Sequence, residues 1–574
     1  MSKYLFLFTI GPVQSFISQA RKTQDIYTGS FLLSHLIDSV MKELEDKVNN
    51  CELIFPHKDI KFKPNRFIAE IESDDIEKVG KGLKSFAVNM FKEISISILD
   101  NVTLDSSKPD GFNSQIKDFF QVNWVALPLK EDDYEVTYKK IESYLGSIKN
   151  IRVFEQLNRG RGEIGRKCSL CGERNVLFYK RTAKNKEPAY IQKGVIEIKG
   201  NELNPGEGLC AVCFTKRFCK TASFPSTAEI ALMDKIPKDD LNKFKNKNLD
   251  PQLFFEENLT KDYFEKFGVK TPLEEVKKLR KEILDKNNIK SKNLSKYYAL
   301  VMLDGDIMGK WLSGEFLEEN EKANLKDFHK KASEKLGNYA TEIKDIIGDP
   351  KGKVIYAGGD DVFTFVSVNH LFDVLIELRK EFPKFEEMGT KIKNNKGSTA
   401  SAGVVIAHYK TPLSEVLKWA RKMEHEAKES GGRDSFAIAV LKRSGEISKS
   451  ILKWEFNNSS SIEILEDLIE FLRQEDFSNT FIKNLCFEFR QLISKEGKCR
   501  ELAIFKTELK RLVGRSCMMK RKQNETKDEL ENRKKEAINN LSENLNTLYI
   551  NNKSFDNFLS ALSIAEFIER GGVI

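Results

Sequence analysis

The sequence lacks the features that mark membrane or secreted proteins. No apolar run in its 574 residues approaches the roughly 18 needed to cross a bilayer. The apolar segment at residues 4–10 is short, and Gly11-Pro12 and polar residues follow where a leader peptide would be cleaved. Nine unevenly spaced cysteines do not make a disulfide framework. We therefore expect a cytoplasmic protein with no membrane partner, in which residues 4–10 form a buried strand.

The chain also has little excess of one charge. Its 94 Lys and Arg against 86 Asp and Glu leave a net charge of +8, which permits a nucleic-acid partner without requiring one. With 40% hydrophobic and 31% charged residues, the composition excludes a fibrous or wholly disordered chain. The length is too great for one hydrophobic core and suggests about four domains.

Changes in residue pattern along the chain predict an α/β (α+β) protein with a duplicated domain, although no repeat of residue identity proves the duplication. The expected segments are residues 1–150, a first α/β domain; 151–222, a glycine-rich insert with four cysteines; 223–290, a helical linker; 291–445, a second α/β domain; and 446–574, helices only.

A pair of aspartates in the second α/β domain gives the sharpest signal. Two strand patterns, at residues 354–357 and 362–368, flank Gly358-Gly359-Asp360-Asp361. The glycines allow a tight hairpin turn and leave room for a phosphate, and the aspartates lie at its tip. Between two apolar strands such a charged pair needs a compensating cation. A structural turn is the alternative, as it is for adjacent aspartates elsewhere in this chain.

A third carboxylate, Asp304, ends the strand expected at residues 298–303 and is followed by Gly305 and Asp306. Carboxylate oxygens are ligands that Mg²⁺ prefers. Two such ions, about 3.5–4 Å apart, activate a hydroxyl and stabilise the phosphate under attack and the leaving group. We therefore predict a catalytic Mg or Mn site at Asp304, Asp360 and Asp361, as in the palm domain of nucleotide polymerases and cyclases.

Other residues are candidates for binding the nucleotide. Gly358 and Gly359 belong to the same hairpin. Ser401 opens a strand of small residues and is either a base-contacting hydroxyl or part of a tight strand start. The helix expected at residues 413–428 carries three lysines, of which Lys428 is the first candidate to bind a triphosphate. A solvated helix face is the alternative for all three.

The four cysteines of the insert form two C-x₂-C pairs, Cys168 with Cys171 and Cys210 with Cys213. Four thiolates can close a tetrahedral structural zinc site. The pairs are further apart than the usual 15–20 residues or so. A redox pair is the alternative, but two pairs favour zinc.

A glycine-rich stretch before the first cysteine carries basic residues that suit binding of a nucleic-acid backbone. A solvated surface is the alternative. These residues are Arg152, Arg159, Arg161, Arg166 and Lys167.

Several motifs in combination resemble the large subunit of type III CRISPR RNA-targeting complexes of the Cmr (III-B) kind. They lie at residues 8–30, 64–67 (Pro-Asn-Arg-Phe), 224–228, 303–309 and 358–361. The resemblance implies two ferredoxin-like palm domains, a zinc insert between them and a helical C-terminal domain. It implies that the second palm converts ATP into cyclic oligoadenylate once guide RNA has captured target RNA. Some relatives are thought to join AMP to S-adenosylmethionine instead.

The resemblance also implies roles for residues and partners. Asp304, Asp360 and Asp361 would hold the metals, while the first palm, whose strands lack this aspartate set, would be catalytically silent and form a wall of the nucleotide site. The partners would be the other subunits of the complex, with guide and target RNA bound through it. Many members begin with a nuclease domain bearing a His-Asp pair, and none of the six histidines here precedes an aspartate, so DNA cutting is not expected.

Two alternative functions stay open. The chain could be a non-catalytic scaffold and RNA-binding subunit that keeps the palms for assembly. It could also be a stand-alone polymerase or guanylate cyclase that shares the palm.

Overall fold

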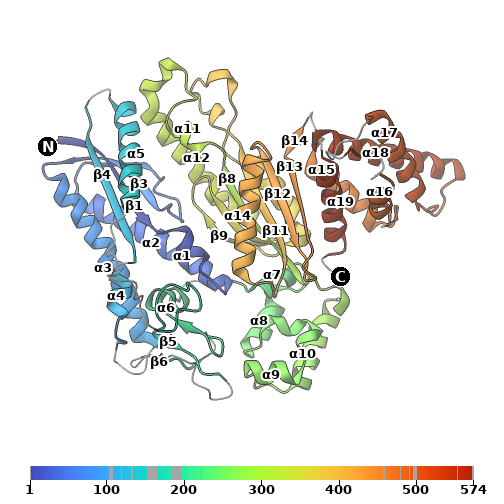
Figure 1. Cartoon of the computed structure of the whole chain (residues 1–574), viewed down its shortest axis with the longest axis horizontal. Helices are drawn as coiled ribbons and strands as arrows, with labels where there is room; N and C mark the ends of the chain where they lie inside the picture. The colour runs from blue at the N-terminus through green and yellow to red at the C-terminus, as the bar shows by residue number, and fades with distance from the viewer. Residues whose placement is uncertain are drawn as a thin grey trace.

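The computed structural model describes residues 2–571, except 103–107, 118, 131–132, 152–164, 183–194, 201, 221–222, 457–458, 479, 490–491, 495–500 and 553. Two sheets with their helices occupy the left and centre of Figure 1, and groups of helices lie below and to the right.

The first sheet has the order β2-β3-β1-β4, and all neighbouring strands are antiparallel. With one helix after the first strand and one after the third, this is the ferredoxin-like arrangement. Its elements are β1 (Ser2–Gly11), α1 (Gln14–Ser18), α2 (Thr23–Lys47), β2 (Cys51–Phe55), β3 (Arg66–Ser73), α3 (Ile76–Val102), α4 (Phe112–Lys117), β4 (Gln121–Pro128) and α5 (Tyr134–Asn150).

The second sheet repeats this topology and extends it. Its order is β13-β12-β11-β8-β10-β9, so β8 to β11 follow the order of the first palm, while β12 runs parallel to β11 and β13 closes the edge. The elements are β8 (Tyr297–Gly305), α11 (Met308–Leu312), α12 (Leu325–Ile346), β9 (Gly352–Ala357), β10 (Val362–Ser367), α13 (Leu371–Lys380), β11 (Ala400–His408), α14 (Leu413–Glu429), β12 (Ser435–Leu441) and β13 (Ile447–Lys453).

The expectation of helices only after residue 446 is wrong for the first residues of that segment. β13 pairs with β12, and the short strands β14 (Glu455–Phe456) and β15 (Ser459–Ser460) follow it. β13 is half exposed and rich in serine and lysine. Edge strands often carry charged and polar side chains, which hinder pairing with another chain, and such residues weaken the apolar alternation.

The two palms cover each other reciprocally. Helix α2 of the first palm packs against β9, and α12 of the second packs against β2. Ile26 of α2 shares a core with Leu300 and Ile355, whereas Leu336 of α12 shares one with Leu7 and Ile54. Each sheet thus buries one face under its own helices and part of the other under its neighbour's.

The remaining segments attach to this pair of palms. The insert contains β5 (Phe178–Tyr179), β6 (Ile196–Glu197), β7 (Gly208–Leu209) and α6 (Ala211–Phe218), and the linker contains α7 (Thr227–Leu232), α8 (Lys238–Asn246), α9 (Lys261–Phe267) and α10 (Leu273–Lys286). At the C-terminal end are α15 (Ser461–Arg473), α16 (Phe481–Phe489), α17 (Leu502–Ser516), α18 (Lys527–Asn552) and α19 (Phe555–Glu569). These last helices continue the apolar core of the second palm. Among the residues described, no helix combines the length and apolarity needed to span a membrane.

Candidate active site and zinc centre

Three carboxylates converge at one end of the second sheet. Asp304 lies in β8, and Asp360 and Asp361 form the turn between β9 and β10. Leu303 is paired with Val362 across the ladder, so Asp304 and Asp361 are each one residue further toward this end. An oxygen from each of the three side chains lies within 4.8 Å of the others. This arrangement of hard oxygen donors can hold a divalent cation.

Glycines allow this close approach. Gly359 has φ of 95°, a conformation that glycine adopts without strain. A Cβ on Gly305 would lie 2.9 Å from the Cβ of Asp360, and one on Gly358 would lie 2.1 Å from the hydroxyl of Tyr356. Gly358 and Gly359, predicted to contact nucleotide, are therefore also required by the geometry of the turn.

The carboxylates are crowded and repel one another. Burial and the charge of Asp361 raise the pKa of Asp360 to about 7, and burial raises the pKa of Asp361 to about 6. The Asp361 side chain keeps an exposed surface, but the protein around it removes part of its hydration. Both ionised forms are costly without a counter-ion, so a cation at this point would stabilise them.

Helix α14 adds two charged residues that face the aspartates. Lys428 contacts the carboxylate of Asp304, and its Nζ lies 3.0 Å from Oε1 of Glu424. Burial and the charge of Asp361 raise the pKa of Glu424 to about 7, whereas burial and Arg433 lower the pKa of Lys428 to about 8. The sequence pointed to Lys428 but not to Glu424, whose one signal is its position one helical turn before that lysine.

This helix reaches the site because it packs directly on β11. A Cβ on Gly403 would lie 2.2 Å from the backbone nitrogen of Glu424 and 2.4 Å from the carbonyl oxygen of Ala420. Any larger residue would push α14 away. The other lysines of this helix point elsewhere, since Lys422 lies over the ring of Trp419 and Lys418 is exposed.

Asp306 and Ser401 are hydrogen-bonded to each other. Asp306 is buried and accepts hydrogen bonds of 2.8 Å from the hydroxyls of Thr399 and Ser401 and one of 2.9 Å from the backbone N–H of Asp434. Ser401 is fully buried. This position favours the tight strand start over the predicted contact of Ser401 with a base, and Asp306 ties β8, β11 and β12 together instead of joining the acidic cluster.

The first palm has a different pair at the matching point of its sheet. Phe8 is opposite Phe67, as Leu303 is opposite Val362, and one residue further lie Thr9 and Arg66. A hydroxyl and a guanidinium cannot bind a cation as two carboxylates do. Arg66 instead lowers the pKa of Asp360 slightly through its charge, although burial of that aspartate dominates, and it lies 3.1 Å from Glu142.

The insert brings its four cysteines into one cluster. The sulfurs of Cys168, Cys171, Cys210 and Cys213 lie within 4.8 Å of one another, and those of Cys171 and Cys210 are 3.8 Å apart. Zinc–sulfur bonds of about 2.3 Å in a tetrahedron place the sulfurs about 3.8 Å apart. Backbone N–H groups of Leu170 and Cys213 each lie 3.5 Å from a cluster sulfur. The cluster can therefore bind zinc.

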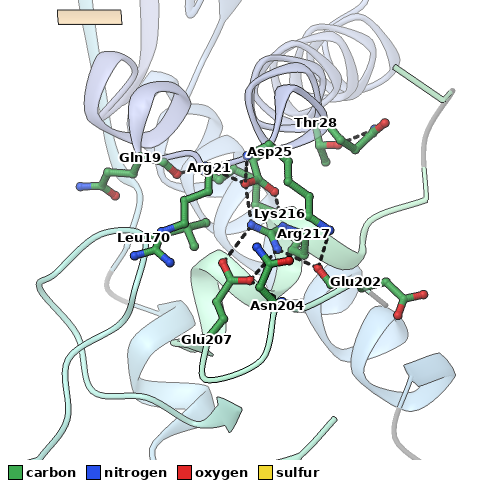
Figure 2. Close-up of polar contacts among 12 residues, drawn as sticks. Gln19, Arg21, Asp25, Thr28, Leu170, Glu202, Asn204, Glu207, Lys216 and Arg217 are labelled. Atoms are coloured by element: carbon green, nitrogen blue, oxygen red, sulfur yellow. Dashed lines mark hydrogen bonds and ion pairs between the residues drawn. The ribbon is translucent and has the colours of Figure 1, made fainter. Parts of the chain in front are cut away.

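A buried ion-pair network fastens this insert to the first palm, as Figure 2 shows. Arg217 of α6 contacts Asp25 of α2 and lies 3.3 Å from Glu207. Asp25 also accepts hydrogen bonds from the backbone N–H groups of Arg21 and Lys22. Asp25 belongs to the motif at residues 8–30, so part of that motif serves this attachment.

Of the five basic residues before the first cysteine, the structure describes two. Arg152, Arg159 and Arg161 lie outside the described residues. Arg166 donates to the carbonyl oxygen of Gly206, and Lys167 donates to the side chain of Asn175 at 2.9 Å.

A duplicated ferredoxin-like palm with an acidic turn in its second copy defines the class of this protein. Residues 297–437 match the family described as "Cas10/Cmr2, second palm domain", and residues 5–124 match "CRISPR-associated protein Cmr2, N-terminal". Over these two segments the chain is similar to the Cmr2 type of large subunit.

Individual proteins show a similarity of the same kind. The CRISPR system Cmr subunit Cmr2 of Pyrococcus furiosus is 28% identical over 81% of this chain, which spans 65% of that protein. The fold is similar to a chain of the type III-B Cmr-β complex solved by cryo-EM in the apo state, with a TM-score of 0.60 at 15% identity over 92% of this chain and 78% of that one. For the complex bound to cognate target RNA the TM-score is 0.58 at 16% identity, over 92% and 80%.

Proposed function

We propose that the second palm is a nucleotidyltransferase that converts ATP into a cyclic oligoadenylate, or joins AMP to S-adenosylmethionine. The 3′-hydroxyl of one ATP would attack the α-phosphate of the next, and pyrophosphate would leave. The observation that carries the proposal is the convergence of Asp304, Asp360 and Asp361. Divalent cations such as Mg²⁺ or Mn²⁺, when bound there, would supply the charge that activates a hydroxyl and stabilises a phosphate.

The residues of the chain would divide the remaining work. Asp304, Asp360 and Asp361 would bind the metal at the end of the sheet. Lys428, which contacts Asp304 in the structure, would be released from it when a cation binds and would then be free to pair with the triphosphate. Glu424 lies 3.0 Å from Nζ of Lys428 and would orient this lysine.

The first palm would form a wall of the site without catalysing the reaction. Thr9 and Arg66 at the matching point of its sheet support this role. Arg66 is near enough to act electrostatically on Asp360, and so it is a candidate for contacting bound phosphate across the boundary between the palms.

We also propose that the chain acts within a type III-B complex and responds to target RNA captured by guide RNA. The similarity to the Cmr2 subunit of the Pyrococcus furiosus Cmr system, and the fold similarity to a Cmr-β complex bound to cognate target RNA, support these partners. The alternative, a non-catalytic scaffold, would require the acidic cluster to persist without use.

A direct assay tests the proposal. The assembled complex is incubated with labelled ATP, Mg²⁺ or Mn²⁺ and complementary RNA, and the product is identified by mass spectrometry. We expect Asp360→Asn with Asp361→Asn to reduce synthesis about a thousandfold or more, because charge stabilisation of the transition state is lost. Asp74→Asn with Asp75→Asn, an exposed pair, is the matched control and should leave synthesis unchanged.

Other results of this assay would support other functions. Synthesis at the wild-type level in the variant would refute the site. An intact complex that makes no product from any nucleotide would favour the scaffold. Preference for GTP, or extension directed by a template, would favour a cyclase or polymerase of another kind.

A further inference from the structure

A cavity of about 500 Å³ lies where both palms meet the helical linker. Its walls come from α2 and the loop before β3 in the first palm, from the segment around α7 and α8, and from the end of α12 and the start of β9 in the second palm. We call it the palm–linker cavity. Its volume lies within the range of small-molecule sites in proteins.

The lining of the palm–linker cavity is strongly basic. Five lysines and two acids line it, which leaves three excess positive charges. One lysine, Lys245, contacts Glu229. For the other four, no ion pair to a described residue is found; they are Lys61, Lys238, Lys344 and Lys353.

Two of these cations lie close enough to repel each other, although Asp345 also acts on Lys344 and partly offsets this repulsion. Burial and the charge of Lys61 lower the pKa of Lys344. The two lysines come from different palms, Lys61 from the loop before β3 and Lys344 from α12. Like charges brought together by the fold, in a concave site, attract an anionic ligand with several charges.

The cavity also has an aromatic side. The rings of Tyr27 and Phe62 meet edge to face at 6.3 Å, and Nζ of Lys344 lies 5.4 Å from the centre of the Phe62 ring. Met233 adds an apolar thioether. A ligand that carries both phosphates and a planar apolar group would match the two parts of this lining.

The cavity is separate from the acidic cluster. It meets β9 at Gly352, Lys353 and Val354, whereas Asp360 and Asp361 follow the opposite end of that strand. β9 has six residues, so its ends lie about 17 Å apart. The connection between the sites is Tyr356, whose ring lies 6.4 Å from that of Phe62 and whose hydroxyl donates to Gly358 in the turn at 3.2 Å.

We propose that the palm–linker cavity is a second nucleotide site, which binds the oligophosphate of a nucleotide with its lysines and the base along Tyr27 and Phe62. No metal is needed, because lysines supply the positive charge. A bound nucleotide would bridge both palms and the linker, and so would stabilise one arrangement of the three. This inference does not depend on the reaction proposed above.

Binding to a catalytically disabled chain tests the proposal. The full chain with Asp360→Asn and Asp361→Asn is titrated with ATP in EDTA by isothermal calorimetry, which removes metal-dependent binding at the acidic cluster. We expect binding to persist, and to weaken about tenfold or more when Lys61→Gln and Lys344→Gln are added. Lys78→Gln with Lys335→Gln, two exposed lysines outside the cavity, one on each palm, is the control and should bind as before.

A second variant separates binding in the cavity from general attraction. Asn242 is exposed on α8 and lines the cavity, so Asn242→Trp should fill it without a change in charge and weaken ATP binding to a similar extent. A short single-stranded RNA without a triphosphate is titrated in parallel. Loss of RNA binding alone in these variants would identify an RNA strand as the source of the same phosphates.

Two results would overturn the inference. One is that the disabled chain binds neither ATP nor RNA in EDTA. The other is that both cavity variants bind as tightly as the control. Either could occur whether or not the complex synthesises product, so failure here is distinguishable from failure of the proposed reaction.

Discussion

The ion-pair network between α2 and α6 allows a quantitative test of how the insert is held. The side chains of Asp25 and Glu207 are 0% exposed and that of Arg217 is 2% exposed. Burial by itself would raise the pKa of Asp25, but the charge and hydrogen bonds of Arg217 outweigh it and hold that pKa below its usual range. Arg217 is the cation that contacts both buried carboxylates, and the charges of Lys22 and Lys216 also act on the network.

Replacing that arginine should be severe. Arg217→Met leaves Asp25 and Glu207 buried without the guanidinium, and removing one partner of a buried pair costs about 3–5 kcal/mol. For a cooperative unit of 150–250 residues, this is a fall in melting temperature of about 6–20 °C. Asp25→Asn should cost less, because Arg217 keeps Glu207. Thermal unfolding of the full chain, followed by circular dichroism and by release of bound zinc, measures both effects.

The control is an exposed pair. Glu470 and Arg473 lie 3.2 Å apart, and their side chains are 52% and 57% exposed, so Glu470→Gln should cost at most about 0.5 kcal/mol. If Arg217→Met lowered the melting temperature no more than this control, water would reach the network and the argument from burial would fail.

Three further predictions concern other parts of the chain. Chelation of zinc, or Cys210→Ser, should make the insert sensitive to limited proteolysis, because the free energy of metal binding that stabilises the folded insert would be lost. Unchanged resistance in a zinc-free chain would count against the zinc site. Burial lowers the pKa of His329 to about 4. As the pH falls below about 6.5, the histidine is therefore protonated in the unfolded chain before it is protonated in the folded chain. Between pH 6.5 and pH 4 the wild type should lose up to about 3 kcal/mol more stability than His329→Gln. Chemical denaturation at several pH values measures this difference, and equal acid sensitivity of the two proteins would contradict it. Gly403→Ala should displace α14 and destabilise the second palm by about 1–3 kcal/mol or more. Synthesis of product from ATP should be lost as well. Normal stability would show that the helix can move aside.

Much of the fold could be predicted from short stretches of sequence. Strands were expected at residues 4–10, 66–71 and 298–303, and the structure has β1, β3 and β8 there. The hairpin at residues 358–361 and the paired cysteines were also readable, because turns and metal knuckles need particular residues at fixed short spacings. The edge strand β13 was missed, because its serines and lysines interrupt the apolar alternation by which strands are recognised.

The surroundings of the acidic cluster could not be read in the same way. Asp304 and Asp306 look equivalent in sequence, yet one joins the cluster and the other is buried beneath hydroxyls. Glu424 approaches the site because Gly403 lets α14 rest on β11. These differences arise from contacts between segments far apart in the chain.

The sequence by itself determined the local units of this protein: the strands, the acidic turn and the cysteine pairs. Each of these depends on backbone conformation and on the chemistry of neighbouring residues. Only the tertiary structure decided which units meet. The reciprocal packing of α2 on β9 and α12 on β2 sets Arg66 near Asp360 and gathers the lysines of the palm–linker cavity, because burying the second face of each sheet requires a helix from the other palm.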